Sequence, residues 1–269
     1  MWVRGGRIAA SRRTGGAAAA ITCALLGATG CTGIKGFARA VNADVRFIAF
    51  GDSATAGPSE RDYPDALREQ LGEPAAVFVN EGRGGETTGE GLKRLRDLIQ
   101  KGIYPNARFL LYWEGGNNVN HFIAEHDALL IASPGDEHYP LSHDLARELD
   151  KIEDDVRAAI EAARNAHLTV LVATYYLMSE DLDACEATPP GALTRDQARR
   201  ANDYIRLLNR RLRTAASDAG AVLVDVESLD GLLRGERGNY YNCNHLAARG
   251  NEIVGGLFAE RVQQTGNQR

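Results

Sequence analysis

Four short segments of this sequence carry side chains that are suited to acyl transfer. Ser53 lies in the tight turn Gly51–Gly57, where its hydroxyl is a candidate nucleophile. Asn80–Thr87 is a glycine-rich turn whose backbone N–H groups can bind an anion, and Gly115–Asn118 adds side-chain amides. His245 stands near the C-terminus, directly before a predicted helix. A nucleophile, backbone amides, a side-chain amide and an imidazole are together the groups that acyl transfer requires.

Each of these segments also has an ordinary structural interpretation. A serine at such a turn is often a helix N-cap, loop asparagines commonly form turns, and a lone histidine is commonly a cap or a surface residue. The glycine-rich turn is also compatible with phosphate binding. However, Thr87 stands where the third glycine of a dinucleotide fingerprint counted from Gly82 would be, and there is no Walker lysine.

The elements that would position these segments alternate along the chain. Short apolar runs predict strands that are buried on both faces, and longer stretches with apolar residues three and four apart predict helices. The five predicted strands are Val45–Phe50, Ala75–Asn80, Arg108–Trp113, Leu168–Thr174 and Ala221–Val224. The five predicted helices are Asp62–Leu71, Gly89–Lys101, Leu141–Ala166, Thr194–Ala219 and Leu246–Gln264.

This alternation of strands and helices predicts an α/β fold with a parallel sheet. Three of the five strands are followed at once by one of the chemically suggestive segments, and the fourth segment comes later, after the fifth strand. Ligands bind at that edge of such sheets. Asn117–Pro140 has no clear pattern and is interpreted as one long irregular loop, either a lid or a surface loop.

In order and spacing, the four segments resemble the SGNH hydrolases, also called GDSL-type esterases and lipases, from about Val45 to Val262. The resemblance implies a three-layer α/β/α sandwich with a five-stranded parallel sheet, as in flavodoxin-like folds. It implies Ser53 as nucleophile and His245 as general base. It also implies an oxyanion hole formed by the backbone N–H groups of Ser53 and Gly85 and the side chain of Asn117. An α/β-hydrolase elbow would instead require glycine where Thr55 stands.

Two positions depart from the pattern of that family. Asn242 stands three residues before the histidine, where family members usually have aspartate, and Asn118 stands where they commonly have a second aspartate. An amide oxygen at position 242 accepts a hydrogen bond from the imidazole but brings no charge. In a serine protease the corresponding change costs about 10⁴ in turnover. Upstream acids that are alternative partners for the histidine are Asp225, Glu227 and Asp230.

The expected activity is that of a serine esterase that hydrolyses carboxylic esters through an acyl-enzyme. The substrate is left open among a short-chain ester, a lysophospholipid and an acetylated sugar. The alternative is a catalytically weakened module that binds carbohydrate or lipid in the cell envelope. Because no H-E-x-x-H or paired-cysteine motif is present, neither a metal nor a cofactor is expected. A small-molecule or glycan ester is the expected partner of a monomeric protein.

The N-terminus has the features of an export signal. Residues 1–30 contain four arginines and no acidic residue, and an uncharged, alanine-rich tract ends in small residues before Cys31. The segment resembles a bacterial lipoprotein signal, which would place a lipid on Cys31 and attach the protein to a membrane. A twin-arginine signal and a single membrane-spanning anchor are the alternatives. The predicted division is a signal peptide at 1–30, a linker at 31–44 and the hydrolase-like domain at 45–265.

Charge and cysteine content agree with an exported, globular domain. The chain has 269 residues, of which 44% are hydrophobic and 25% charged, as in ordinary globular proteins. Its net charge of −5 becomes −9 without residues 1–30, which argues against a nucleic-acid partner. Cys185 and Cys243 would remain in an oxidising compartment, either periplasmic or at the cell surface, so a disulfide between them is predicted.

Overall fold

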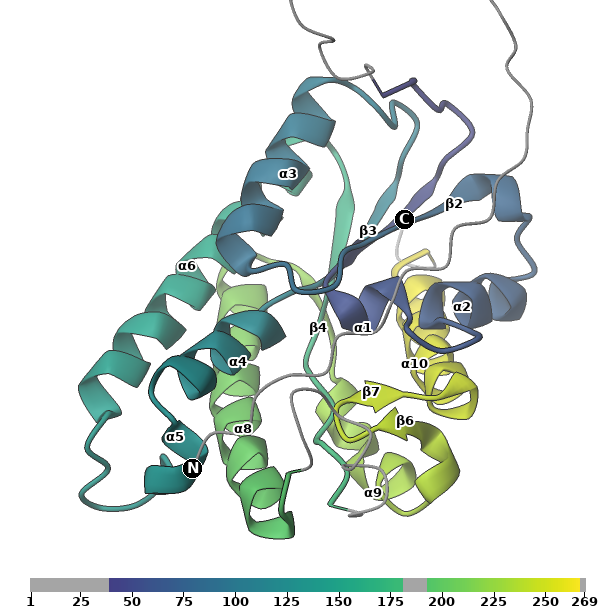
Figure 1. Ribbon diagram of the computed structural model, residues 1–269. Helices are drawn as coiled ribbons and strands as arrows, with labels where there is room; N and C mark the ends of the chain where they lie inside the picture. The colour runs from purple at the N-terminus through teal and green to yellow at the C-terminus, as the bar shows by residue number, and fades with distance from the viewer. Residues whose placement is uncertain (1–38, 181–192, 267–269) are drawn as a thin grey trace, which may run out of the picture. The chain divides into compact units, whose positions relative to one another are not determined.

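The computed structural model describes residues 39–180 and 193–266 of the chain. In this part, five parallel strands form one sheet in the order β2-β1-β3-β4-β5 (Figure 1). The strands are β1 (Phe47–Gly51), β2 (Phe78–Gly82), β3 (Phe109–Trp113), β4 (Thr169–Ala173) and β5 (Val222–Val224). The α/β fold and the parallel, five-stranded sheet are therefore confirmed.

Helices cover both faces of the sheet and make three layers (Figure 1). On one face α2 (Tyr63–Leu71) packs against α10 (Ala248–Gly266). On the other face α6 (Ser142–Asn165) lies between α3 (Thr88–Gln100) and α8 (Arg195–Asp218). These five helices agree with the predicted ones to within one or two residues at nearly every end. The predicted capping box of α8, in which Thr194 and Gln197 exchange hydrogen bonds, is present.

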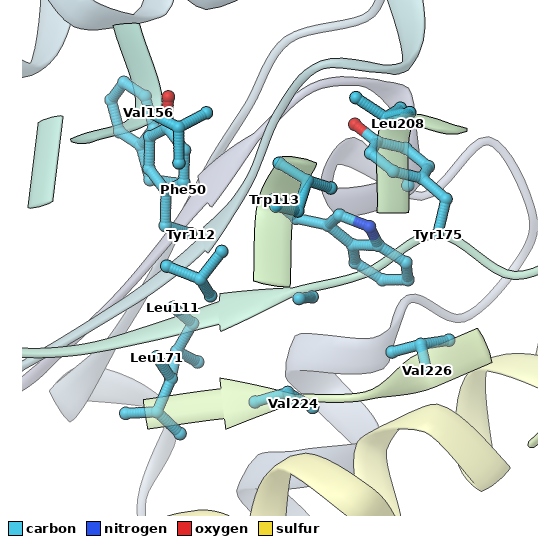
Figure 2. Packing of buried hydrophobic residues seen from close by; sticks show 14 of the residues in the cluster. Phe50, Leu111, Tyr112, Trp113, Val156, Leu171, Tyr175, Leu208, Val224 and Val226 are labelled. Atoms are coloured by element: carbon cyan, nitrogen blue, oxygen red, sulfur yellow. The ribbon is translucent and has the colours of Figure 1, made fainter. Parts of the chain in front are cut away.

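The strand register brings the candidate residues together. Gly51 at the end of β1 is paired with Gly82 at the end of β2 and with Trp113 at the end of β3. The three strands thus end at the same level, and the turns that follow them start side by side. The core beneath this edge is packed with aromatic rings. In Figure 2, Trp113 lies beside Tyr175, and their ring centroids are 5.7 Å apart.

The prediction of one irregular loop over 117–140 is wrong in its first half. The segment forms α4 (Gly116–Glu125) and the short α5 (Ala128–Ile131). Val119 and Phe122 are buried, with the three-residue spacing of one helix face. The flanking glycines and asparagines obscured this short helical pattern.

The second strand also begins later than predicted, at Phe78, because Ala75–Val77 forms a 3₁₀ turn after Pro74. The last part of the chain contains elements that were not predicted. They are the 3₁₀ turns Val226–Leu229 and Arg237–Asn239, helix α9 (Asp230–Leu233) and a two-stranded antiparallel sheet of β6 (Tyr240–Asn242) and β7 (His245–Leu246).

Several predictions concern residues outside the described part. The signal peptide, Cys31 and most of the predicted linker lie before residue 39, and Cys185 lies between 180 and 193. These assignments, and the disulfide with the buried Cys243, stay predictions. Within the described residues, no helix has the length and apolar character that a membrane span needs.

Candidate active site

A tight turn between β1 and the short helix α1 (Ser53–Ala56) fixes Ser53. Gly51 and Gly82 allow the close approach of neighbouring backbone. A methyl group at Gly51 would lie 2.2 Å from the carbonyl oxygen of Trp113, and one at Gly82 would lie 2.2 Å from the backbone nitrogen of Ala56. No side chain fits at either position, so the turn packs directly against the ends of β2 and β3.

Asp52, and not Ser53, is the N-cap of this short helix. Its side chain accepts a hydrogen bond from the backbone N–H of Ala54 at 2.8 Å, and the Tyr175 hydroxyl donates to it at 2.6 Å. Burial raises the pKa of Asp52 to about 6, and these two hydrogen bonds oppose the shift. The interpretation of Ser53 as a cap therefore does not apply, and its hydroxyl is available to another group.

That group is His245, which follows the turn of the β6–β7 hairpin. Its Nε2 lies 2.9 Å from Ser53 Oγ, and its Nδ1 lies 3.1 Å from Asn242 Oδ1. Ser53 and Asn242, which contact opposite sides of the ring, are separated in sequence by most of the domain. The structure thus brings together the three residues that the sequence singled out as nucleophile, base and partner of the base.

The hydrogen bonds of Asn242 fix the tautomer of the histidine. Asn242 Oδ1 accepts hydrogen bonds from the backbone N–H groups of Asn244 and His245, at 3.1 and 2.9 Å. An amide nitrogen cannot accept these bonds, so the atom facing the ring is the oxygen. His245 Nδ1 must then carry the proton, and Nε2 presents its lone pair to the Ser53 hydroxyl.

No carboxylate among the described residues bonds to His245. Asp225 and Glu227 both pair with Arg213, at 2.6 and 2.7 Å, and Asp230 pairs with Arg234. These upstream acids therefore do not replace the missing aspartate. Burial without a compensating negative charge lowers the pKa of His245 below its ordinary value.

The two remaining candidate residues lie in the turn after β2 and in the first turn of α4, which follows β3. Gly85 has a left-handed backbone (φ +83°), and a methyl group on the neighbouring Gly84 would lie 3.9 Å from Ser53 Cβ. Asn117 Nδ2 donates a hydrogen bond to the carbonyl oxygen of Glu86 at 2.9 Å, which leaves its second amide hydrogen available. Both turns are thus close to the serine.

A pocket opens beside Ser53, Asn117 and His245. One wall is apolar and comes from α4, α8 and the segment after β4. This wall consists of Val119, Ile123, Met178, Ile205 and Leu208. Asp52 is the single acidic residue that lines the pocket, and no lysine or arginine of the described chain contributes to it. Gly85 does not line this pocket but a separate, more open depression.

The second departure from the family pattern has a structural reason. Asn118 is buried, accepts a hydrogen bond from the backbone N–H of Thr88 at 2.9 Å and donates one to Glu148 at 2.8 Å. Aspartate could accept the first bond but could not donate the second. Asn118 therefore joins the starts of α3 and α4 to α6 and does not face the reacting groups.

Sequence reasoning missed two buried acidic residues next to these turns. Glu86 directly follows Gly85, and Glu114 directly follows the last residue of β3. Both are buried. A carboxyl group at the end of a run of apolar residues is the signal that could have identified Glu114. Within residues 39–180 and 193–266, no cluster of His, Cys, Asp and Glu has the arrangement of a metal site.

Comparison with solved structures finds the same fold in several esterases. An acetyl xylan esterase is 21% identical with a TM-score of 0.55, over 81% of this chain and 100% of its own. A GDSL-like lipase from Bacteroides thetaiotaomicron is 17% identical with a TM-score of 0.54, over 85% of this chain and 93% of its own. The psychrotrophic esterase EstA from a Pseudoalteromonas species, in a structure inhibited by monoethylphosphonate, is 16% identical with a TM-score of 0.53. That match covers 82% of this chain and 98% of the esterase.

Among curated proteins, the sequence comparison finds no match. The sequence profile of the GDSL-like lipase/acylhydrolase family matches residues 49–253, which include all four segments singled out above. The match covers most of the chain. This protein therefore belongs to the GDSL-like lipase/acylhydrolase family.

Proposed function

We propose that this protein is a carboxylic ester hydrolase in which Ser53 is the nucleophile and His245 the general base. The observation that carries the proposal is the 2.9 Å contact between Ser53 Oγ and the unprotonated Nε2 of His245. This distance lies within the range for proton transfer between a nucleophile and its base. Family membership supports the same class of reaction.

The reaction begins when Ser53 Oγ attacks the ester carbonyl carbon and gives its proton to His245 Nε2. The negative charge that develops on the carbonyl oxygen is stabilised by the backbone N–H groups of Ser53 and Gly85 and by Asn117 Nδ2. His245 then protonates the leaving alcohol oxygen as the carbon–oxygen bond breaks. Water attacks the resulting acyl-serine and gives a proton to His245. His245 returns this proton to Ser53 Oγ as the acyl–oxygen bond breaks, which releases the carboxylic acid and regenerates the free serine and the neutral histidine.

Asn242 takes the place of the triad acid in this mechanism. It orients the imidazole ring and selects the tautomer, which are two of the tasks of the aspartate in a serine triad. It brings no negative charge to stabilise the imidazolium that forms after proton transfer. The enzyme is thus expected to be slower than a relative with aspartate at this position.

The lining of the pocket favours esters with an apolar acyl chain over acetyl esters. Against its five apolar side chains a hydrocarbon chain gains about 0.8 kcal/mol for each CH₂ that it buries, while Asn120 and Asn244 add amide groups elsewhere in the lining. Of the substrates considered from the sequence, a short- to medium-chain acyl ester or a lysophospholipid fits this wall better than an acetylated sugar.

The assignment of Ser53 is tested with p-nitrophenyl acetate and a serine-reactive phosphonate. We expect the wild-type protein to hydrolyse the ester and to be labelled on Ser53, and the Ser53→Ala variant to do neither. Hydrolysis that survives in the variant would show that another residue is the nucleophile. Labelling without hydrolysis would favour the alternative of a weakened module that binds lipid or carbohydrate.

The acyl preference is tested with p-nitrophenyl acetate, butyrate and octanoate. We expect kcat/KM to increase by up to about fourfold for each CH₂ that the pocket buries. Ile205→Trp, which fills the pocket, should lower the rate with octanoate and leave the rate with acetate nearly unchanged. Leu232→Trp is the matched control, because Leu232 is exposed on α9. A rate that falls with chain length in the wild-type protein would contradict the preference.

We also propose that the protein acts outside the cytoplasm, as a periplasmic or cell-surface enzyme. The arginine-rich start and the small residues before Cys31 support this location. Metabolic labelling with a radioactive fatty acid, compared between the wild-type protein and Cys31→Ala, tests whether a lipid is attached. Label that is present in both proteins would exclude Cys31 as its site.

A further inference from the structure

Glu114 is a buried acid that the proposed mechanism does not use. Only 1% of the residue is exposed, and both of its carboxyl oxygens are enclosed. None of the hydrogen-bond donors in the described chain reaches either oxygen. A methyl group at Gly91 on α3 would lie 2.9 Å from Glu114 Oε1, so the helix closes directly over the carboxyl group. An ionised carboxylate in this place would lose its hydration without gaining a partner.

The groups around Glu114 are mostly acidic. Facing it are the carboxyl groups of Asp52, in the turn after β1, and of Glu86, in the turn before α3. Arg94 on α3 is the cation that faces it in the described chain, and the phenols of Tyr112 and Tyr175 also lie nearby. Desolvation and these two carboxyl groups raise the pKa of Glu114 well above its ordinary value.

Arg94 cannot neutralise Glu114 as well, because it is already committed to Glu86. Its Nε lies 2.7 Å from Glu86 Oε1 and 3.1 Å from Oε2. Its Nη2 also donates a hydrogen bond to Oε2 of the same carboxylate. The guanidinium carbon also lies 3.8 Å from the centroid of the Phe50 ring. Glu86 is therefore the ionised member of the pair, and it can accept a hydrogen bond from a neutral neighbour.

Glu86 and Glu114 lie close in sequence to the two proposed oxyanion donors outside the nucleophile turn. Gly85 directly precedes Glu86, and Asn117 follows Glu114 by three residues. The two segments are already joined once, by the 2.9 Å hydrogen bond from Asn117 Nδ2 to the backbone carbonyl of Glu86. A second bond between the side chains of the two glutamates would fix their separation.

We propose that Glu114 is a positioning residue that remains protonated and donates a hydrogen bond to the Glu86 carboxylate, thereby fixing the relative position of Gly85 and Asn117. The proton stays on Glu114 throughout the reaction, and the residue does not touch the substrate. The effect of Glu114 on turnover depends on the function proposed above. Its protonation can be tested without that function.

The first test is infrared spectroscopy at neutral pH, which needs no activity. We expect a carboxylic-acid band in the wild-type protein that is absent from Glu114→Gln. Failure to find that difference would show that Glu114 is ionised and would overturn the proposal. Because this measurement does not depend on hydrolysis, its outcome is separate from the outcome of the Ser53→Ala test.

The second test compares Glu114→Gln with Glu114→Leu. Glutamine can still donate to Glu86 without a titratable proton, so we expect it to keep turnover near the wild-type value. Leucine cannot donate, so kcat should fall by about 10- to 100-fold with KM little changed. A glutamine variant as slow as the leucine variant would contradict the proposal. Thermal unfolding checks that each variant is folded. If the leucine variant does not fold, the turnover of Glu114→Gln and the infrared band of the wild-type protein test the proposal.

A double-mutant comparison then separates positioning from general stabilisation. If Glu114 acts through Asn117, Glu114→Leu should slow the Asn117→Ala variant much less than it slows the wild-type protein. If the two losses multiply fully, Glu114 does not act through Asn117, and the assignment as a positioning residue fails.

Discussion

The two sides of this site are positioned by different means. Ser53 and Asn117 follow β1 and β3, two neighbouring strands in the middle of the parallel sheet. His245 and Asn242 belong to the β6–β7 hairpin, a sheet of two short strands that is separate from the main one. The serine side is therefore fixed by the strands of the main sheet. The histidine side is fixed by a small hairpin that is hydrogen-bonded to the segment after β4, through the hydroxyls of Tyr176 and Tyr240.

This difference determines how each side tolerates change. On the serine side, backbone contacts at Gly51 and Gly82 leave no space for a side chain. On the histidine side, one oxygen atom of Asn242 accepts hydrogen bonds from two backbone N–H groups and from the imidazole. Substitutions on the serine side should thus affect both stability and activity, whereas substitutions at Asn242 should mainly affect the protonation and orientation of His245.

The largest effect is expected from Asn117→Ala on the serine side. Loss of one oxyanion donor costs about 2.7–4 kcal/mol of barrier, so kcat should fall by about 10²- to 10³-fold. KM should change little, because the donor acts mainly in the transition state. Steady-state kinetics with a p-nitrophenyl ester measure both constants. Asn165→Ala, at the exposed end of α6, is the control. A variant with normal kcat would remove Asn117 from the oxyanion hole.

Gly82→Ala should weaken both the fold and the reaction. The added methyl group would meet the backbone nitrogen of Ala56 and push the turn that carries Ser53. Overpacking of this kind costs about 1–3 kcal/mol of stability, and a displacement near 1 Å costs about 10²-fold in rate. Denaturant unfolding and ester hydrolysis report the two effects. Gly135→Ala is the matched control, since no atom lies within 4 Å of the added group. If Gly82→Ala and Gly135→Ala had the same stability and the same rate, the serine side would not be rigid.

Asn242→Asp should raise turnover near neutral pH by about tenfold. The carboxylate can accept the same three hydrogen bonds and adds a negative charge beside the imidazolium, and one unit of pKa corresponds to 1.36 kcal/mol. Asn242→Leu, which accepts none of these bonds, should be slower than the wild-type protein. An unchanged or lower rate for the aspartate variant would mean that another group already stabilises and orients His245.

The smallest expected effect is a displaced pH profile. Hydrolysis requires neutral His245, and activity is lost as the pH falls through the pKa of this group. Because burial lowers that pKa, the pH at which kcat/KM falls to half of its maximum should lie below 6.5, the ordinary pKa of histidine. In Asn242→Asp the added anion should move this acidic limb to higher pH. A wild-type limb above pH 6.5 would show that His245 has an anionic partner.

The sequence determined the main elements of the fold and the residues of the site. The alternation of buried strands and amphipathic helices is a local pattern, and five strands and five helices could be identified from it. The four segments could be selected because a parallel sheet places the ends of its strands at one edge. Helix α4 was missed because glycines and asparagines at its start obscured its apolar spacing. The β6–β7 hairpin was missed because strands of two or three residues have little periodicity of their own.

Only the tertiary structure decided which groups share a proton. It showed that Ser53 Oγ faces His245 Nε2 and that Asn242, and no carboxylate of residues 39–180 and 193–266, contacts the ring. Asp225, Glu227 and Asp230 pair with arginines elsewhere. The burial of Glu114 against α3 was likewise invisible in the sequence. Residue types and the order of the main elements along the chain can be identified from local sequence patterns. Hydrogen bonding and desolvation depend on distances between segments, and only the folded chain sets these distances.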